Sequence, residues 1–163
     1  MSIDAAEHRR IKPTTPSDYL AVMSRAVFQA GLSWAAIDER WPDLMKAFLG
    51  FDAQKVAQFD EGDVDDLMAY PGIIHSQKKI LGTIHNAQTL LSLDQEFGGV
   101  RTYLRSLKSY DDLVADMKKR FKFVGELSAY YFLYRVGEKV PPYEKWITTV
   151  DGDHPRIREM VTE

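Results

Sequence analysis

Apolar residues recur every three or four positions along most of this chain, which is the spacing of one face of an α-helix. The longest example lies between residues 76 and 91, where Ile80, Ile84, Ala87 and Leu91 follow this spacing. Charged and polar side chains occupy the remaining positions of that stretch. The pattern therefore predicts a long amphipathic helix with one buried face.

A second helix is predicted just after residue 15, where the sequence carries a start signal. Thr15 can act as an N-cap, Pro16 suits the first turn, and Asp18 supplies the acid of a capping box. Apolar residues then continue at helical spacing until Gly31, which is a helix-ending residue. We therefore expect a helix from about residue 16 to residue 30.

No stretch alternates between apolar and polar residues, so no β-strand is predicted. The remaining periodic stretches are separated by glycine and proline, and they predict about eight or nine short helices. A length of 163 residues suits one domain with a sizeable core. We expect a compact all-α fold in a single domain, residues 1–163, with an N-terminal arm at about 1–15 and a peripheral C-terminal tail at about 150–163.

Composition excludes several classes of site. The chain has no cysteine, so it has no disulfide, no thiolate nucleophile and no cysteine-bound zinc. No apolar run approaches the roughly 20 residues that span a bilayer, and the N-terminus has no signal-peptide core. We therefore expect a cytoplasmic protein that does not bind membranes. The formal net charge of -3 argues against a uniformly basic surface but allows a local basic patch.

Such a patch occurs in KKRFKFVGELSA, residues 118–129, between two predicted helices. Small residues at Gly125 and Ala129 are expected to let these helices approach closely. The unpaired amides and the dipole at the second helix start favour an anion such as phosphate. The alternative is that the cations only stabilise the C-terminus of the first helix.

Three segments resemble the DNA-3-methyladenine glycosylase I family, in the order that the family has. They are FQAGLSWAAI (28–37), GIIHSQKKILGTIHNA (72–87) and KKRFKFVG (118–125), the last one glycine shorter than the family's hairpin. The resemblance covers roughly residues 18–137. It implies an all-α glycosylase fold of two lobes with a helix-hairpin-helix motif.

The resemblance also implies a function in base-excision repair. Such an enzyme would bind double-stranded DNA containing a damaged base, flip out an alkylated purine such as 3-methyladenine and hydrolyse its N-glycosidic bond. We expect it to act as a monomer with no cofactor and no metal. The alternative is a non-catalytic helix-hairpin-helix DNA-binding protein that has lost base excision.

The resemblance implies a base-binding role for Trp34, whose electron-rich ring suits a cationic purine. Phe28 and Gln29, in the same motif, are further base-binding candidates. For each of the three, the alternative is a structural role in the core or at a helix end. The family has a glutamate that contacts the base where this chain has Ala26, and the family's zinc-binding termini are missing.

The hairpin residues are expected to contact the DNA backbone. The candidates share the basic patch and the turn that follows it: Lys119, Arg120, Lys122, Phe123, Val124 and Gly125. Many helix-hairpin-helix glycosylases carry a catalytic aspartate about twenty residues beyond the hairpin. Near that place stands Glu144, which is the candidate catalytic group. The alternative for Glu144 is an ordinary surface residue.

Overall fold

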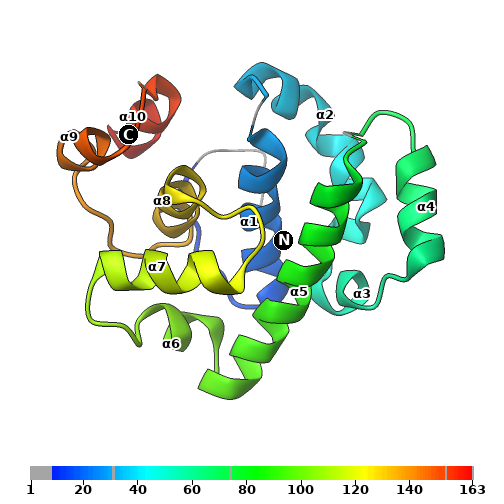
Figure 1. Ribbon diagram of the computed structural model, residues 1–163, viewed down its shortest axis with the longest axis horizontal. Coiled ribbons are helices and arrows are strands. Elements are labelled where there is room, and N and C mark those ends of the chain that lie inside the picture. The colour runs from blue at the N-terminus through cyan, green and yellow to red at the C-terminus, as the bar shows by residue number, and fades with distance from the viewer. Residues whose placement is uncertain (1–8, 31, 74, 153, 163) are drawn as a thin grey trace.

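The computed structural model describes residues 9–30, 32–73, 75–152 and 154–162, and this part of the chain is helical without strands (Figure 1). The elements in chain order are α1 (Pro16–Gln29), α2 (Trp34–Ala47), η1 (Leu49–Phe51), α3 (Ala53–Ala57), α4 (Glu61–Ala69), α5 (Gln77–Phe97), α6 (Val100–Leu104), α7 (Tyr110–Arg120), α8 (Glu126–Arg135), α9 (Tyr143–Trp146), η2 (Ile147–Thr149) and α10 (Pro155–Thr162). The predicted all-α fold is confirmed.

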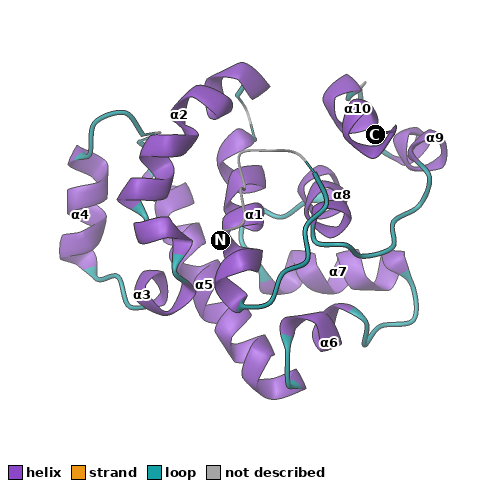
Figure 2. Cartoon of the chain, turned by 180° about the vertical axis from the view of Figure 1, so that it is seen from behind, coloured by secondary structure: helices purple, strands orange, loops and turns teal. Residues whose placement is uncertain are grey.

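Helix α1 lies at the centre and joins two groups of helices. It packs against α5 and α3 on one side and against α8 on the other. Helices α2 to α4 form one lobe with α5, and helices α6 to α10 form the other lobe, as Figures 1 and 2 show from opposite sides. The long helix α5 contacts both α3 and α6, so it braces the two lobes.

The capping box at the start of α1 is formed as predicted. The Asp18 N–H donates to the Thr15 hydroxyl at 3.3 Å, and the Thr15 N–H donates to an Asp18 carboxylate oxygen at 3.3 Å. These bonds satisfy amides that a helix start leaves without partners. Ten consecutive residues of α1, Tyr19 to Phe28, are buried. A clear start signal therefore fixes the helix that carries the centre of the core.

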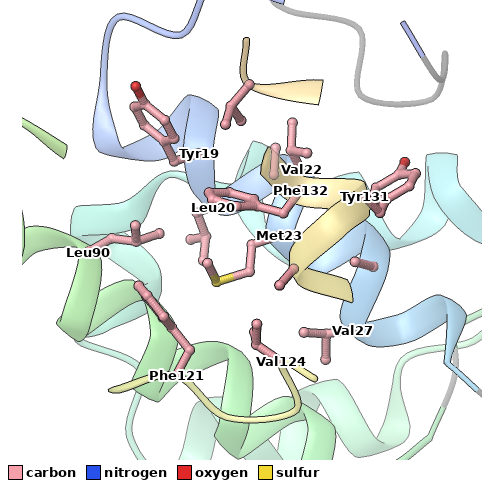
Figure 3. Close-up of a cluster of buried hydrophobic side chains, with 14 of the residues drawn as sticks. Tyr19, Leu20, Val22, Met23, Val27, Leu90, Phe121, Val124, Tyr131 and Phe132 are labelled. Atoms are coloured by element: carbon pink, nitrogen blue, oxygen red, sulfur yellow. The ribbon is translucent and has the colours of Figure 1, made fainter. Parts of the chain in front are cut away.

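Hydrophobic contacts anchor the loop between α7 and α8 in the same core. Phe121 and Val124 point inward toward Met23 and Leu20 of α1 (Figure 3), and they are 4% and 6% exposed. Burying side chains of this size contributes roughly 1.5–3 kcal/mol each. The hairpin is thus part of the folded core and not an appended loop.

The C-terminal segment, expected to be a peripheral tail at about 150–163, contains a helix with a buried face. Residues 155–162 form α10, in which Ile157 and Met160 are only 1% and 5% exposed. Their three-residue spacing places both on one face of the helix, which packs inward.

At the other end of the chain, the Ile11 N–H donates to the Arg135 carbonyl at 2.7 Å. Among the described helices, none has the length and apolar character needed to cross a membrane.

Candidate functional site

The predicted hairpin is present, and α5 holds its turn through backbone contacts. The Asn86 side chain accepts from the Lys122 N–H at 2.8 Å and donates to the Lys122 carbonyl at 3.1 Å. His85 Nε2 lies 2.9 Å from the Arg120 carbonyl oxygen. Asn86 is only 1% exposed, so its amide is fixed by its surroundings. The conformation of the turn therefore depends on α5 as well as on its own sequence.

Phe123 lies at the tip of the turn in a conformation that favours glycine. Its φ is +62°, and its side chain is 44% exposed. A non-glycine residue in this region is held there by its surroundings at a cost of order 1 kcal/mol. The ring lies over Gly82 of α5, where a Cβ atom would come within 2.8 Å of Phe123 Cδ2. The missing side chain at Gly82 thus makes room for an aromatic ring that faces outward.

The start of α8 faces open space. Gly125 is its N-cap, and no side chain of the described residues caps this end. A Cβ atom at Gly125 would meet no heavy atom of the described chain within 4 Å. The prediction that Gly125 permits close packing of the two helices is therefore wrong, although Ala129 is fully buried. The first-turn amides and the helix dipole favour an anion at this point.

The basic residues of the hairpin divide into two groups. The Lys118 ammonium donates to Glu126 at 2.9 Å, and the Arg120 guanidinium donates to Asp116 at 2.7 Å. Arg120 also lies over the Tyr103 ring, 5.6 Å from its centroid, so it is directed toward α6. Lys118 and Arg120 therefore have partners within the protein, which favours the alternative of a structural role for these two residues. Lys119 and Lys122 are exposed at the turn.

Trp34 begins α2 and is partly buried, with one side packed against the core. The Ser33 hydroxyl caps the helix by accepting from the Ala36 N–H at 3.1 Å. The Trp34 ring lies 5.7 Å from the Tyr131 ring of α8, at 46°. The indole is therefore neither sealed in the core nor fully exposed, and it sits between α2 and α8.

Charged residues surround the indole. Asp38, one turn after Trp34 on α2, forms an ion pair with Arg25 of α1, whose side chain is 0% exposed. Arg156 of α10 donates to the other Asp38 oxygen at 2.9 Å, and its guanidinium carbon lies over the Trp34 ring at 5.7 Å. We refer to Trp34, Asp38, Arg25, Tyr131 and Arg156 as the Trp34 cluster.

Burial shifts two pKa values within the Trp34 cluster. Burial raises the pKa of Tyr131, although the positive charges of Arg135 and Arg25 oppose that shift. Burial lowers the pKa of Arg25, and Tyr131 and Asp38 act against the shift. The Tyr131 hydroxyl accepts a hydrogen bond from Arg135 at 3.2 Å. The buried side of the cluster is thus a fixed polar network beneath the indole.

The other two predicted base-binding residues have structural roles here. Phe28 is 0% exposed and packs on Phe48 at 5.6 Å between ring centroids, so it lies in the core and not beside the indole. Gln29 donates from Nε2 to the Leu32 carbonyl at 3.0 Å and holds the end of α1. Ala26 is buried and brings no charge to this region.

Glu144 does not lie in the Trp34 cluster. It is exposed on the short helix α9. Burial, and then the negative charge of Glu144, raise the pKa of Tyr130 to about 12. Figure 1 shows α9 at one edge of the molecule, with α8 and α10 between it and α2. The prediction of Glu144 from its spacing after the hairpin is therefore not supported by its position.

The hairpin and the Trp34 cluster share helix α8. This helix has Gly125 as its N-cap and carries Tyr131 against Trp34. Six residues at 1.5 Å per residue separate these two positions by about 9 Å along the helix axis. The open start of α8 and the contact with Trp34 therefore lie within two turns of the same helix.

Sequence reasoning missed Asp38, Arg25 and Arg156. Asp38 had a usable signal, because a residue four positions after Trp34 lies on the same helical face. Arg156 had no such signal, since it is 118 residues from Asp38 in the sequence.

Comparison with known proteins gives a consistent result. A family model described as methyladenine glycosylase matches residues 15–139. The chain is 31% identical to DNA-3-methyladenine glycosylase 1 of Escherichia coli in an alignment of 130 positions that covers 67% of this chain and 70% of that protein. It is 26% identical to the DNA-3-methyladenine glycosylase of Haemophilus influenzae over 130 residues, with the same two shares.

Solved structures agree with these sequence matches. The 3-methyladenine DNA glycosylase I of Staphylococcus aureus has a TM-score of 0.68 and 26% identity, covering 82% of this chain and 83% of that one. A variant of a 3-methyladenine DNA glycosylase I in complex with 3-methyladenine has a TM-score of 0.67 and 26% identity, covering 81% and 85%.

Proposed function

The chain belongs to the methyladenine glycosylase family, and we propose from this premise that it is a base-excision repair enzyme for alkylated purines in double-stranded DNA. The family predicted from the sequence is thereby confirmed. The relatives described above are all named as glycosylases, which favours the enzyme over the non-catalytic alternative. The proposed substrate is a purine such as 3-methyladenine.

The hairpin would hold the DNA backbone beside the lesion. A phosphate at the open start of α8 would accept from the first-turn amides, and Lys122 and Lys119 would add charge nearby. Phe123 would face the DNA from the tip of the turn, where it is 44% exposed. These contacts do not depend on base sequence, which suits an enzyme that must find a lesion in any context.

The damaged base would stack on Trp34 after leaving the duplex. A methylated purine is positively charged, so an indole face attracts it by cation–π interaction as well as by stacking. Water adds to C1′ of the sugar and gives one proton to bulk solvent, and the base leaves with the electrons of the N-glycosidic bond, which neutralise its charge. Gln29 would contribute by holding the loop before Trp34 through the Leu32 carbonyl.

The observation that carries this proposal is the position of the partly exposed indole. Trp34 contacts Tyr131, on the same helix whose open N-terminus can bind phosphate. One rigid helix would therefore fix the distance between the backbone contact and the base contact. We further propose that the protein works as a single domain, as a monomer and in the cytoplasm.

The test is release of bases from alkylated duplex DNA, identified by mass spectrometry. Base–aromatic stacking is worth about 1–3 kcal/mol, so Trp34→Ala should slow single-turnover release of 3-methyladenine by roughly 10- to 100-fold. Trp34→Phe keeps an aromatic face and is the matched control, with a smaller loss. Release by Trp34→Ala at the wild-type rate would refute the stacking role, and no release of any alkylated base by the wild type would refute the function.

A further inference from the structure

The Trp34 face is covered by a cation from the chain's own C-terminal helix. The Arg156 guanidinium carbon lies over the indole, 5.7 Å from the ring centroid. Its Nη2 also donates to Asp38 at 2.9 Å. Arg156 lies beyond residue 139, where the family match ends. The family-like core thus has its proposed stacking residue covered by a segment outside the match.

A guanidinium and a methylated purine present the same chemistry to these two groups. Both are planar and positively charged, so both gain from lying on an indole face. Both also gain from a nearby carboxylate, which Asp38 supplies and Ala26 cannot. Arg156 therefore contacts the Trp34 ring and the Asp38 carboxylate, which are the two groups that a cationic base would contact at this place.

The Arg156 contact is of a kind that a ligand can displace. The side chains of Arg156 and Asp38 are 40% and 39% exposed, and exposed ion pairs contribute roughly 0–1 kcal/mol. Helix α10 is anchored separately by Ile157 and Met160, which are 1% and 5% exposed. The guanidinium can therefore move away while the helix stays in place.

Asp38 has a second partner that would keep it in position. Arg25 is 0% exposed and forms an ion pair with the other Asp38 oxygen. It also lies over the Trp41 ring, 5.1 Å from its centroid. When Arg156 leaves, the ion pair with Arg25 thus still holds the carboxylate one helical turn from Trp34.

We propose that Asp38 is the carboxylate that contacts the positively charged base, and that Arg156 occupies the base position until a flipped base displaces it. This inference rests on the proposed function, because it assumes that a cationic purine enters at Trp34. It assigns specificity for charged bases to Asp38 and assigns Arg156 the role of an internal competitor.

The test measures binding of a cationic methylated nucleoside, 7-methylguanosine at pH 6, by quenching of tryptophan fluorescence, with Trp34→Phe defining the signal from the indole. Removing an exposed ion pair and its cation–π contact should vacate the site, so Arg156→Ala should bind about three- to tenfold more tightly than wild type. Arg158→Ala removes the same charge from the same helix and is the matched control, with wild-type affinity expected. Asp38→Asn should bind the cation less tightly while its affinity for neutral guanosine stays the same.

Unchanged or weaker binding by Arg156→Ala would overturn the inference, and so would wild-type binding by Asp38→Asn. Arg156→Ala leaves the buried ion pair intact, so this variant decides the question even when Asp38→Asn does not fold. The outcome is separate from the proposed function. If the wild type releases bases but Arg156→Ala binds the nucleoside with wild-type affinity, only this inference is refuted. If the variants show the expected order of affinities but the wild type releases no base, only the enzymatic activity is refuted.

Discussion

The hairpin and the Trp34 cluster lie on the same helix but are built in different ways. The hairpin is one continuous segment, residues 118–129, and its proposed anion site consists of backbone amides at the start of α8. The Trp34 cluster gathers side chains from α1, α2, α8 and α10. Amides are present whatever the side chains are, whereas each member of the cluster must be one particular residue.

This difference indicates which part of such a protein can change its specificity. A phosphate-binding turn keeps its chemistry as long as its conformation is kept, and here Asn86 holds that conformation from α5. A base site changes with a single side chain. In this chain α1 has Ala26 where the family resemblance implies a glutamate, and our proposal places the carboxylate at Asp38 of α2. If this contrast holds, substitutions in the two regions should have different effects on folding and on DNA binding.

The first prediction concerns Arg25, on which the cluster depends for its shape. Arg25→Ala should lower the free energy of unfolding by about 3 kcal/mol, because it removes a buried partner of Asp38 and leaves a cavity beside Trp41. Urea denaturation followed by circular dichroism measures this loss. The same variant should also release bases more slowly. Less of the protein is folded, and in the folded part the Asp38 carboxylate is no longer held in position.

The matched control removes the exposed partner of the same carboxylate. Arg156→Ala should change the free energy of unfolding by less than about 1 kcal/mol, because its side chain is 40% exposed. A cost for Arg25→Ala no greater than that for Arg156→Ala would show that the cluster has no fixed buried side. The contrast between the two regions would then be wrong.

Much of the fold could be predicted because its signals are local. Thr15 and Asp18 are three residues apart, and they form the predicted capping box. The apolar spacing from Ile80 to Leu91 likewise marked the middle of α5. The packing of the C-terminal segment had a weak signal because α10 is short and three of its eight residues are charged. Ile157 and Met160 are buried and Val161 is partly buried against the core, and only the folded structure shows this packing.

The site could be predicted only in part, for the same reason. The hairpin and Trp34 lie in short segments with recognisable residues, and these segments led to the right family. Glu144 was chosen by its distance along the chain from Gly125, but the chain passes Trp34 at Tyr131 and then runs on to α9 at the edge of the molecule. Asp38 and Arg156 meet only after folding, since 118 residues separate them. A contact of that kind leaves no pattern in a single sequence.

The second prediction concerns the charge at the hairpin. Lys122→Glu should weaken binding to undamaged duplex DNA by about three- to tenfold and reduce the slope of log affinity against log salt by about 1, because one phosphate contact is lost. Lys139→Glu makes the same change of charge beyond the other end of α8 and should leave the slope unchanged. Fluorescence anisotropy with a labelled duplex at several salt concentrations measures both. Equal slopes for the two variants would mean that the hairpin does not contact phosphate.

The third and smallest effect is expected at Gly125, where folding should tolerate a side chain but phosphate binding should not. Its φ of −107° suits any residue, and a Cβ atom there would meet no described heavy atom within 4 Å. Gly125→Ala should therefore change the free energy of unfolding by no more than about 0.5 kcal/mol. A phosphate that approaches the α8 amides would nevertheless meet the added methyl group, so duplex affinity should fall by about two- to fivefold. The two quantities are measured on one preparation, by urea denaturation and by anisotropy. A loss of stability without a loss of affinity would return Gly125 to a packing role and remove the open helix start from the DNA-binding surface.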